Sequence, residues 1–156
     1  MDYIRNNTFK LTKDLSIYDL DYNFDNLSNS IGTLLLHITA LEFKFQLNHF
    51  YKRDITKNEY EKYANAMPKY MNTRKIHGNN LNFYLNELKQ IRRKTLLELK
   101  HLNDEWLFKE IISSKGNNLG NYYYLLKHII NDEISHQGQI KIILKRLKHK
   151  KLTSSF

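Results

Sequence analysis

The 156-residue chain has no cysteine, a single proline and only five glycines. The lack of cysteine excludes disulfide bonds, iron–sulfur ligation and a thiol nucleophile. The scarcity of glycine and proline argues against a many-turned β protein and favours long helices. The chain also lacks an apolar signal-peptide core near its N-terminus and any run of about 18 apolar residues that could span a membrane. The sequence therefore predicts a soluble, cytoplasmic protein with no membrane partner.

Positive charge, by contrast, is abundant. The formal net charge is +9, which would admit a polyanion such as nucleic acid as a partner. Much of the excess lies near the C-terminus, in Lys141, Lys145, Arg146, Lys148, Lys150 and Lys151. Cations there complement the negative end of a helix dipole and keep its surface solvated. Because no RNA-recognition signature or Arg-rich, aromatic-interleaved element accompanies them, a nucleic-acid partner is not expected.

Three long segments have apolar residues at helical spacing, over about 31–51, 81–102 and 121–148. Residues suited to N-caps precede the first two segments: Asn29 or Ser30, and Asn79 or Asn80. Gly32 in the first turn of the first helix is unusual, because glycine costs about 1 kcal/mol relative to alanine within a helix. Close packing against a neighbour would explain it.

Weaker patterns lie between and before these segments. Residues 1–20 contain one short helix with a weak apolar pattern, and Thr56 with Glu59 has the spacing of a capping box for a helix over 57–65. Pro68 is expected to end that helix, and the glycines and asparagines of 113–121 read as a loop.

Together the segments predict an all-α protein with no strands. Three strong amphipathic helices and a weaker fourth fit an antiparallel four-helix bundle with a long crossover, in one domain over 1–156. Cofactor and metal sites in such bundles are built from side chains of facing helices.

The last helix carries polar groups within its apolar stripe. Asp132 and His136 occupy positions where leucine or isoleucine would continue the stripe. Residues four apart lie on one helix face, and a buried carboxylate is costly unless it is paired or binds a cation. His37 in the first long helix offers a second inward histidine. The three residues would form a two-histidine, one-carboxylate site with open positions, suited to Zn²⁺, Ni²⁺, Mn²⁺ or Fe²⁺.

Simpler explanations of these residues stay open. Asp132 could pair with a lysine or accept a hydrogen bond from a buried hydroxyl, and a lone histidine on an apolar face is more often a core residue than a ligand. Glu42, Glu133 and His128 are near enough in register to support the ligands or replace one of them. Four histidines read as surface or loop residues: His49, His77, His101 and His149.

Two segments resemble the DinB-like superfamily, which is also grouped with bacillithiol and mycothiol S-transferase-like proteins. They read NSIGTLLLHITALE, around His37, and ISHQGQIKIILKRL, which begins two residues before His136. HGNNLNFYLNEL and NDEWL resemble intervening segments of some bacterial members. The resemblance extends over residues 12–148, and its specificity lies in the two histidine motifs at the correct separation.

The resemblance implies a bundle with up-down-down-up helix order, often dimeric, with a divalent metal held by three histidines. His37 matches the first ligand and His136 the third, whereas the second position holds Asp132. Zinc or nickel is the expected metal, with manganese or iron as the others to consider. The N-terminal helix is also shorter than is usual in the family.

The resemblance further implies a metal-dependent enzyme, such as a transferase that uses a low-molecular-weight thiol as cosubstrate and forms a homodimer. It identifies no catalytic residue beyond the metal ligands. An alternative is a non-catalytic, dimeric, stress-associated protein whose His/Asp cluster is structural. A third is a basic nucleic-acid accessory protein that uses the lysine-rich helix end.

Overall fold

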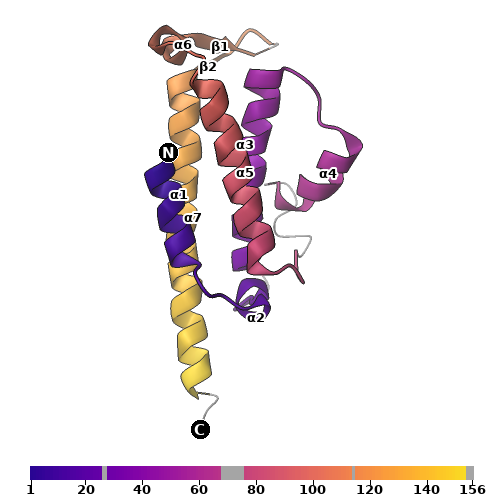
Figure 1. The fold of residues 1–156 in the computed structure, drawn as a ribbon, viewed down its shortest axis with the longest axis vertical. Coiled ribbons are helices and arrows are strands. Elements are labelled where there is room, and N and C mark those ends of the chain that lie inside the picture. Colours follow the sequence, from indigo (N-terminus) through magenta and orange to yellow (C-terminus); the bar gives the residue numbers. More distant parts are fainter. Residues whose placement is uncertain (26–27, 68–75, 114, 154–156) are drawn as a thin grey trace.

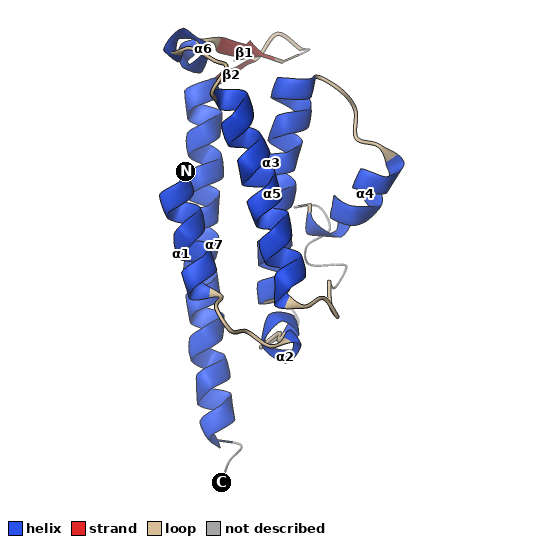
Figure 2. Ribbon diagram, viewed as in Figure 1, coloured by secondary structure: helices blue, strands red, loops and turns tan. Residues whose placement is uncertain are grey.

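The computed structural model describes residues 1–25, 28–67, 76–113 and 115–153. The chain is mainly helical, as predicted, with one small two-stranded sheet (Figures 1 and 2). The elements in chain order are α1 (Asp2–Leu11), α2 (Ile17–Asp21), α3 (Ile31–Phe45), the π-helix η1 (Gln46–Tyr51), α4 (Lys57–Tyr63), the 3₁₀ helix η2 (Ala64–Ala66), α5 (Leu81–Leu99), α6 (Asp104–Phe108), β1 (Glu110–Ile112), β2 (Asn118–Asn121) and α7 (Tyr122–Thr153).

Helices α3, α4 and α5 begin directly after the capping residues that the sequence predicted. Ser30 Oγ accepts a hydrogen bond from the Thr33 amide at the start of α3, and Asn80 Oδ1 accepts from Phe83 at the start of α5. Thr56 and Glu59 form the predicted capping box of α4. Each cap satisfies an amide that has no partner within its helix, which fixes the first turn. Pro68, predicted to end this short helix, lies outside the described residues.

Two sequence predictions about local structure are wrong. Residues 1–20 form two helices, because Asp14 adopts a left-handed conformation after α1 and Ser16 caps a new helix in a capping box with Asp19. The predicted loop over 113–121 contains β2, which pairs antiparallel with β1. Apolar alternation did not reveal this hairpin because it lies on the surface, where neither face of the ribbon must be apolar.

The longest helices set the architecture. Helix α3 packs against α5 and α7, and α1 packs against α7 and α5. Figure 1 shows that α1 and α7 run in one direction and that α3 and α5 run in the opposite direction. Because α3 and α5 are parallel, a long connection that carries η1, α4 and η2 joins the end of α3 to the start of α5. The hairpin and α6 lie at one end, and α7 extends past α2 at the other (Figure 1).

Apolar side chains of these helices form the main core, which includes Leu34, Leu35, Ile38, Leu88 and Ile140. Gly32 lets α3 approach α5 closely: a Cβ at this position would lie 2.5 Å from the Tyr84 hydroxyl oxygen. The close packing expected from Gly32 is therefore confirmed. None of the described helices is long and apolar enough to cross a membrane.

A buried cluster of charges crosses this core. Helices α1, α3, α5 and α7 contribute one residue each, in that order Arg5, Glu42, Arg92 and Glu133. Arg92 bonds to both carboxylate oxygens of Glu42, at 2.8 and 3.0 Å. Two further bonds of 2.9 Å link Arg5 Nη2 to Glu42 and Arg92 Nη2 to Glu133. Two positive and two negative charges balance, so the cluster fixes the relative positions of the four helices without leaving an unpaired buried charge.

Candidate metal centre

His37 lies on the buried side of α3, and its ring is held from outside that helix. Its Nδ1 lies 2.7 Å from the carbonyl oxygen of Ala66 in η2. A carbonyl can only accept a hydrogen bond, so Nδ1 carries the hydrogen and Nε2 of the neutral ring keeps its lone pair. This arrangement is the usual one for a metal-binding histidine, whose second nitrogen donates to a carbonyl or carboxylate.

Asp132 and His136 face His37 from α7. Oδ2 of Asp132 lies 3.4 Å from His136 Nε2 and 3.7 Å from His37 Nε2. The two imidazole rings meet edge to face, with centroids 5.0 Å apart. One helix turn separates Asp132 from His136, which places both side chains on the side of α7 that faces α3. The structure thus brings all three predicted residues together.

The positions of the three possible ligand atoms suit a divalent metal. Their ligand atoms all lie within 4.8 Å of one another. Ligands about 2.0–2.2 Å from a tetrahedral metal lie roughly 3.3–3.6 Å apart, close to the two distances from Asp132. Asp132 Oδ2 is also buried and has no partner with hydrogen-bond geometry among the described residues. The nearer histidine nitrogen, His136 Nε2, lies 3.4 Å from this oxygen. Burial of a carboxylate oxygen without a well-formed hydrogen bond is costly, and a bound cation would remove that cost.

Burial and mutual proximity shift the pKa of each group. Burial lowers the pKa of His37 and favours the neutral ring that can bind a metal. Burial alone would raise the pKa of the Asp132 carboxyl, but His136 and His37 hold it below its ordinary value. Burial alone would likewise lower the pKa of His136, which the adjacent Asp132 carboxylate raises instead. Asp132 is therefore ionised and available as an anionic ligand at neutral pH.

The proposed supporting residues are placed differently from the prediction. Glu42 and Glu133 belong to the arginine cluster, because each carboxylate is taken up by two guanidinium groups. His128 is exposed on α7. The suggestion that Glu42 or Glu133 replaces or supports a metal ligand is therefore wrong. His128 lies outside the group of three ligand atoms, although its charge contributes to lowering the pKa of the Asp132 carboxyl.

The remaining histidines were predicted to lie at the surface. The side chains of His77, His101 and His149 are exposed, as expected. His49 is half-buried between the rings of Phe45 and Tyr122, and the prediction for it is wrong. Phe45 is the last residue of α3 and Tyr122 is the first of α7. Helical periodicity in one segment cannot show the contact with α7.

Sequence reasoning missed the groups that orient the two histidines. The Ala66 carbonyl could not be found, because a main-chain acceptor leaves no signal in the sequence. Gln139, whose Oε1 lies 3.3 Å from His136 Nδ1, sits three residues after its partner and could have been found from helical spacing. Arg5 and Arg92 also left a signal in the sequence. Arg5 lies three residues before Thr8 and Arg92 four residues after Leu88, a spacing that places each arginine on the buried face of its helix.

Comparison with known proteins supports the fold. The structure is similar to the crystal structure of a conserved protein from Enterococcus faecalis, with a TM-score of 0.66 and 17% sequence identity. The similarity covers 91% of this chain and 89% of that chain. At this identity it concerns the fold alone. Protein-family models give no match, and no curated protein matches either. Fold and site together define a helical protein with a candidate divalent-metal centre.

Proposed function

We propose that this chain is a divalent-metal-dependent enzyme of the DinB-like superfamily, with the metal held by His37, Asp132 and His136. The observation that carries the proposal is the convergence of three ligand atoms, one each from His37, Asp132 and His136, within 4.8 Å of one another. One of them, Asp132 Oδ2, has no partner with hydrogen-bond geometry among the described residues. Zinc or nickel suits two imidazoles and one carboxylate best, with manganese or iron as the other metals to test.

The finer assignment of the fold, a DinB-like four-helix bundle, is part of this proposal. Its support is the direction of the helices, with α1 and α7 opposed to α3 and α5 and a long connection between the parallel pair (Figure 1). The expected family order is the same up-down-down-up arrangement. The sequence motifs around His37 and His136 support it as well, because both ligands occupy facing helices.

The expected reaction is transfer to or from a low-molecular-weight thiol. A divalent metal held by His37, Asp132 and His136 would supply a Lewis acid able to stabilise a substrate thiolate. The chain's own residues orient the ligands: Ala66 fixes the tautomer of His37, and Gln139 contacts the outer nitrogen of His136. With three protein ligands, at least one coordination position is left for a substrate. A cytoplasmic homodimer completes the proposal.

The first test is the metal content of protein purified without chelator or affinity nickel. We expect about one metal per chain in the wild type and in His128→Ala, a control that removes an exposed histidine of the same helix. Asp132→Ala and His136→Ala should each lose it, because two remaining ligands bind far more weakly. Thiol-transfer assays would then follow on the loaded protein.

Absence of metal from the wild type, even after reconstitution with zinc, nickel and manganese, would refute the metalloenzyme. The His/Asp cluster would then be structural, as in a non-catalytic helical protein, and the ion pair of Asp132 with His136 would be its basis. Loss of metal only in the His136 variant would instead show that the carboxylate is not a ligand.

A further inference from the structure

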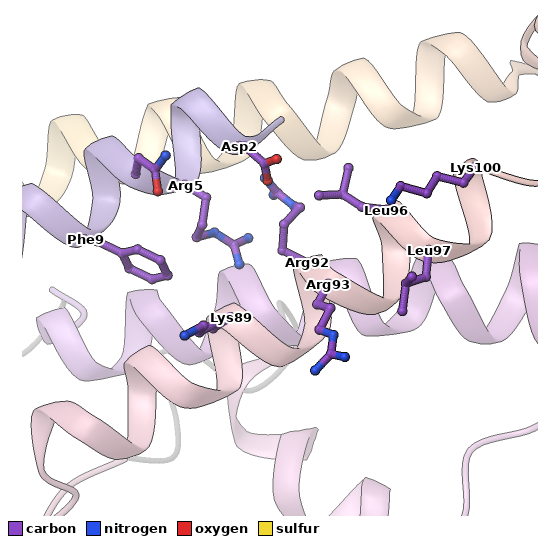
Figure 3. Close-up of a pocket in the computed structure, with 10 residues that line it drawn as sticks. Asp2, Arg5, Phe9, Lys89, Arg92, Arg93, Leu96, Leu97 and Lys100 are labelled. Carbon is purple, nitrogen blue, oxygen red and sulfur yellow. The ribbon is translucent and has the colours of Figure 1, made fainter.

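A groove separates α1 from α5 on the surface of the molecule (Figure 3). Its volume is about 530 Å³, within the range of small-molecule sites. The groove lies outside the candidate metal centre, since none of its lining residues is His37, Asp132 or His136.

The buried arginines explain why the groove stays open. Arg5 from α1 and Arg92 from α5 extend between the two helices, as Figure 3 shows, and reach the glutamates behind them. Two long guanidinium side chains fill the space in which smaller residues would let the helices close. Both arginines are neutralised by Glu42 and Glu133, so the floor of the groove is polar but carries no net charge.

The walls above this floor are apolar. Phe9 comes from α1, and Leu96 and Leu97 come from α5 (Figure 3). Leu97 is 46% exposed, whereas Leu88 and Ile91 on the same helix are buried. Phe9 and Leu96 are partly buried. A concave surface lined by partly or fully exposed leucine and phenylalanine side chains is suited to an alkyl or aryl group.

The rim of the groove is cationic. Lys89, Arg93 and Lys100 are exposed along α5 and lie on one side of it, over about 16 Å of helix. Asp2 is the one acidic residue among the described side chains that line the groove. With Arg5 and Arg92 already paired, the remaining lining charges favour an anion.

Another cavity of the same volume shows the contrast. It lies between the first helices and the end of α7, and its charged lining consists of Asp14, Asp19, Lys148 and Lys151. Lys151 Nζ lies 2.6 Å from an oxygen of Asp19. Equal numbers of acidic and basic groups give that cavity no preference for an anion, in contrast to the groove between α1 and α5.

We propose that the groove between α1 and α5 binds a single-chain anionic amphiphile, with its alkyl chain against Phe9, Leu96 and Leu97 and its carboxylate beside the α5 cations. A second copy of the chain is a poorer occupant, because a two-fold interface would place the same cations opposite each other. A protein partner would need far more contact area than a cavity of this size offers.

Titration calorimetry with dodecanoate, below its aggregation concentration, tests the proposal. We expect saturable binding of one molecule per chain and at least tenfold weaker binding of octanoate, because each buried methylene tightens binding by up to about fourfold. Dodecyltrimethylammonium, which has the same tail and the opposite charge, should show no saturable binding.

Matched variants locate the site. Lys89→Glu should weaken dodecanoate binding roughly threefold to tenfold, and Leu97→Asp should abolish it. Lys94→Glu makes the same charge change on another side of α5, and Leu102→Asp the same polar change outside the groove, so both should bind normally. All four residues are exposed, and circular dichroism would confirm that the variants fold.

Three results would overturn the proposal: equal binding of the cationic and anionic amphiphiles, equal effects of groove and control variants, or no saturable binding of dodecanoate. Sedimentation with anionic phospholipid vesicles in the absence of dodecanoate binding would assign the cationic rim to a membrane surface instead. Metal analysis is independent of each outcome, because the groove contains no ligand of the metal centre.

Discussion

Arg5 bonds to both carboxylate oxygens of Glu133, 128 residues away in the chain, at distances of 2.8 and 3.1 Å. Both side chains are buried, and Thr8 donates a further hydrogen bond of 2.6 Å to the same carboxylate. This pair anchors the short α1 to α7. It also fixes the turn of α7 that carries Asp132, the neighbour of Glu133.

Arg5→Met should lower the free energy of unfolding by about 3–5 kcal/mol, because it leaves Glu42 and Glu133 with one guanidinium between them. Urea denaturation would measure the change. Lys10→Met, at an exposed position of the same helix, should stay within about 0.5 kcal/mol of the wild type. Equal stability of the two variants would show that the buried cluster contributes little to the docking of α1.

Gly32 and Gly138 are both helical, but their surroundings differ. A Cβ at Gly32 would meet Tyr84, whereas a Cβ at Gly138 would have no neighbour within 4 Å in the part of the chain that the structure describes. Gly32→Ala should therefore destabilise the protein by about 1–3 kcal/mol, and Gly138→Ala should stabilise it by about 0.5–1 kcal/mol. Thermal or urea unfolding of the two variants would show whether their stabilities change in opposite directions. Stabilisation by Gly32→Ala would rule out the close approach of α3 to α5.

Metal binding should raise the stability of the folded chain. Zinc at 100 times its dissociation constant would add about 2.7 kcal/mol, which raises the melting temperature by roughly 5–10 °C for a chain of this length. Asp132→Asn should lose most of that shift, and His128→Ala should keep it. A zinc-induced shift of the same size in all three proteins would point to adventitious binding elsewhere.

His49 should make stability depend on pH. Burial lowers its pKa in the folded state, while the unfolded value is about 6.5. The unfolded chain then binds more protons, so the contribution of neutral His49 is fully present above about pH 6.5 and is lost as the pH falls below it. Between pH 7.5 and 5.5 the wild type should lose more stability than His49→Phe. His37 and His136 titrate in both proteins, so their contributions cancel in the comparison.

Much of the local structure could be predicted from the sequence. Ser30, Thr56 and Asn80 act within four residues of themselves, so the starts of α3, α4 and α5 follow from the chain alone. The hairpin of β1 and β2 could not be predicted in this way, because its strands are short and exposed and carry no apolar alternation.

The candidate metal centre was predictable only in part. Helical spacing placed Asp132 and His136 on one face, and the apolar pattern of the first long helix offered His37 as the second histidine, which the family resemblance also matched to a ligand. The main-chain carbonyl of Ala66 carries no sequence signal, and the roles of Glu42 and Glu133 depend on which helix faces them. The helical positions of Glu42 and Glu133 would have allowed either to be a metal ligand, but each forms ion pairs with arginine instead.

The sequence by itself determined the helices, their caps and the apolar stripes, because these depend on interactions between residues a few positions apart. The tertiary structure decided which polar side chains meet in the core. Arg5, Glu42, Arg92 and Glu133 come from four helices, and their charges could be buried only where all four meet. The same packing left Asp132 facing two histidines rather than a cation of the chain, and it kept α1 and α5 far enough apart to form the groove.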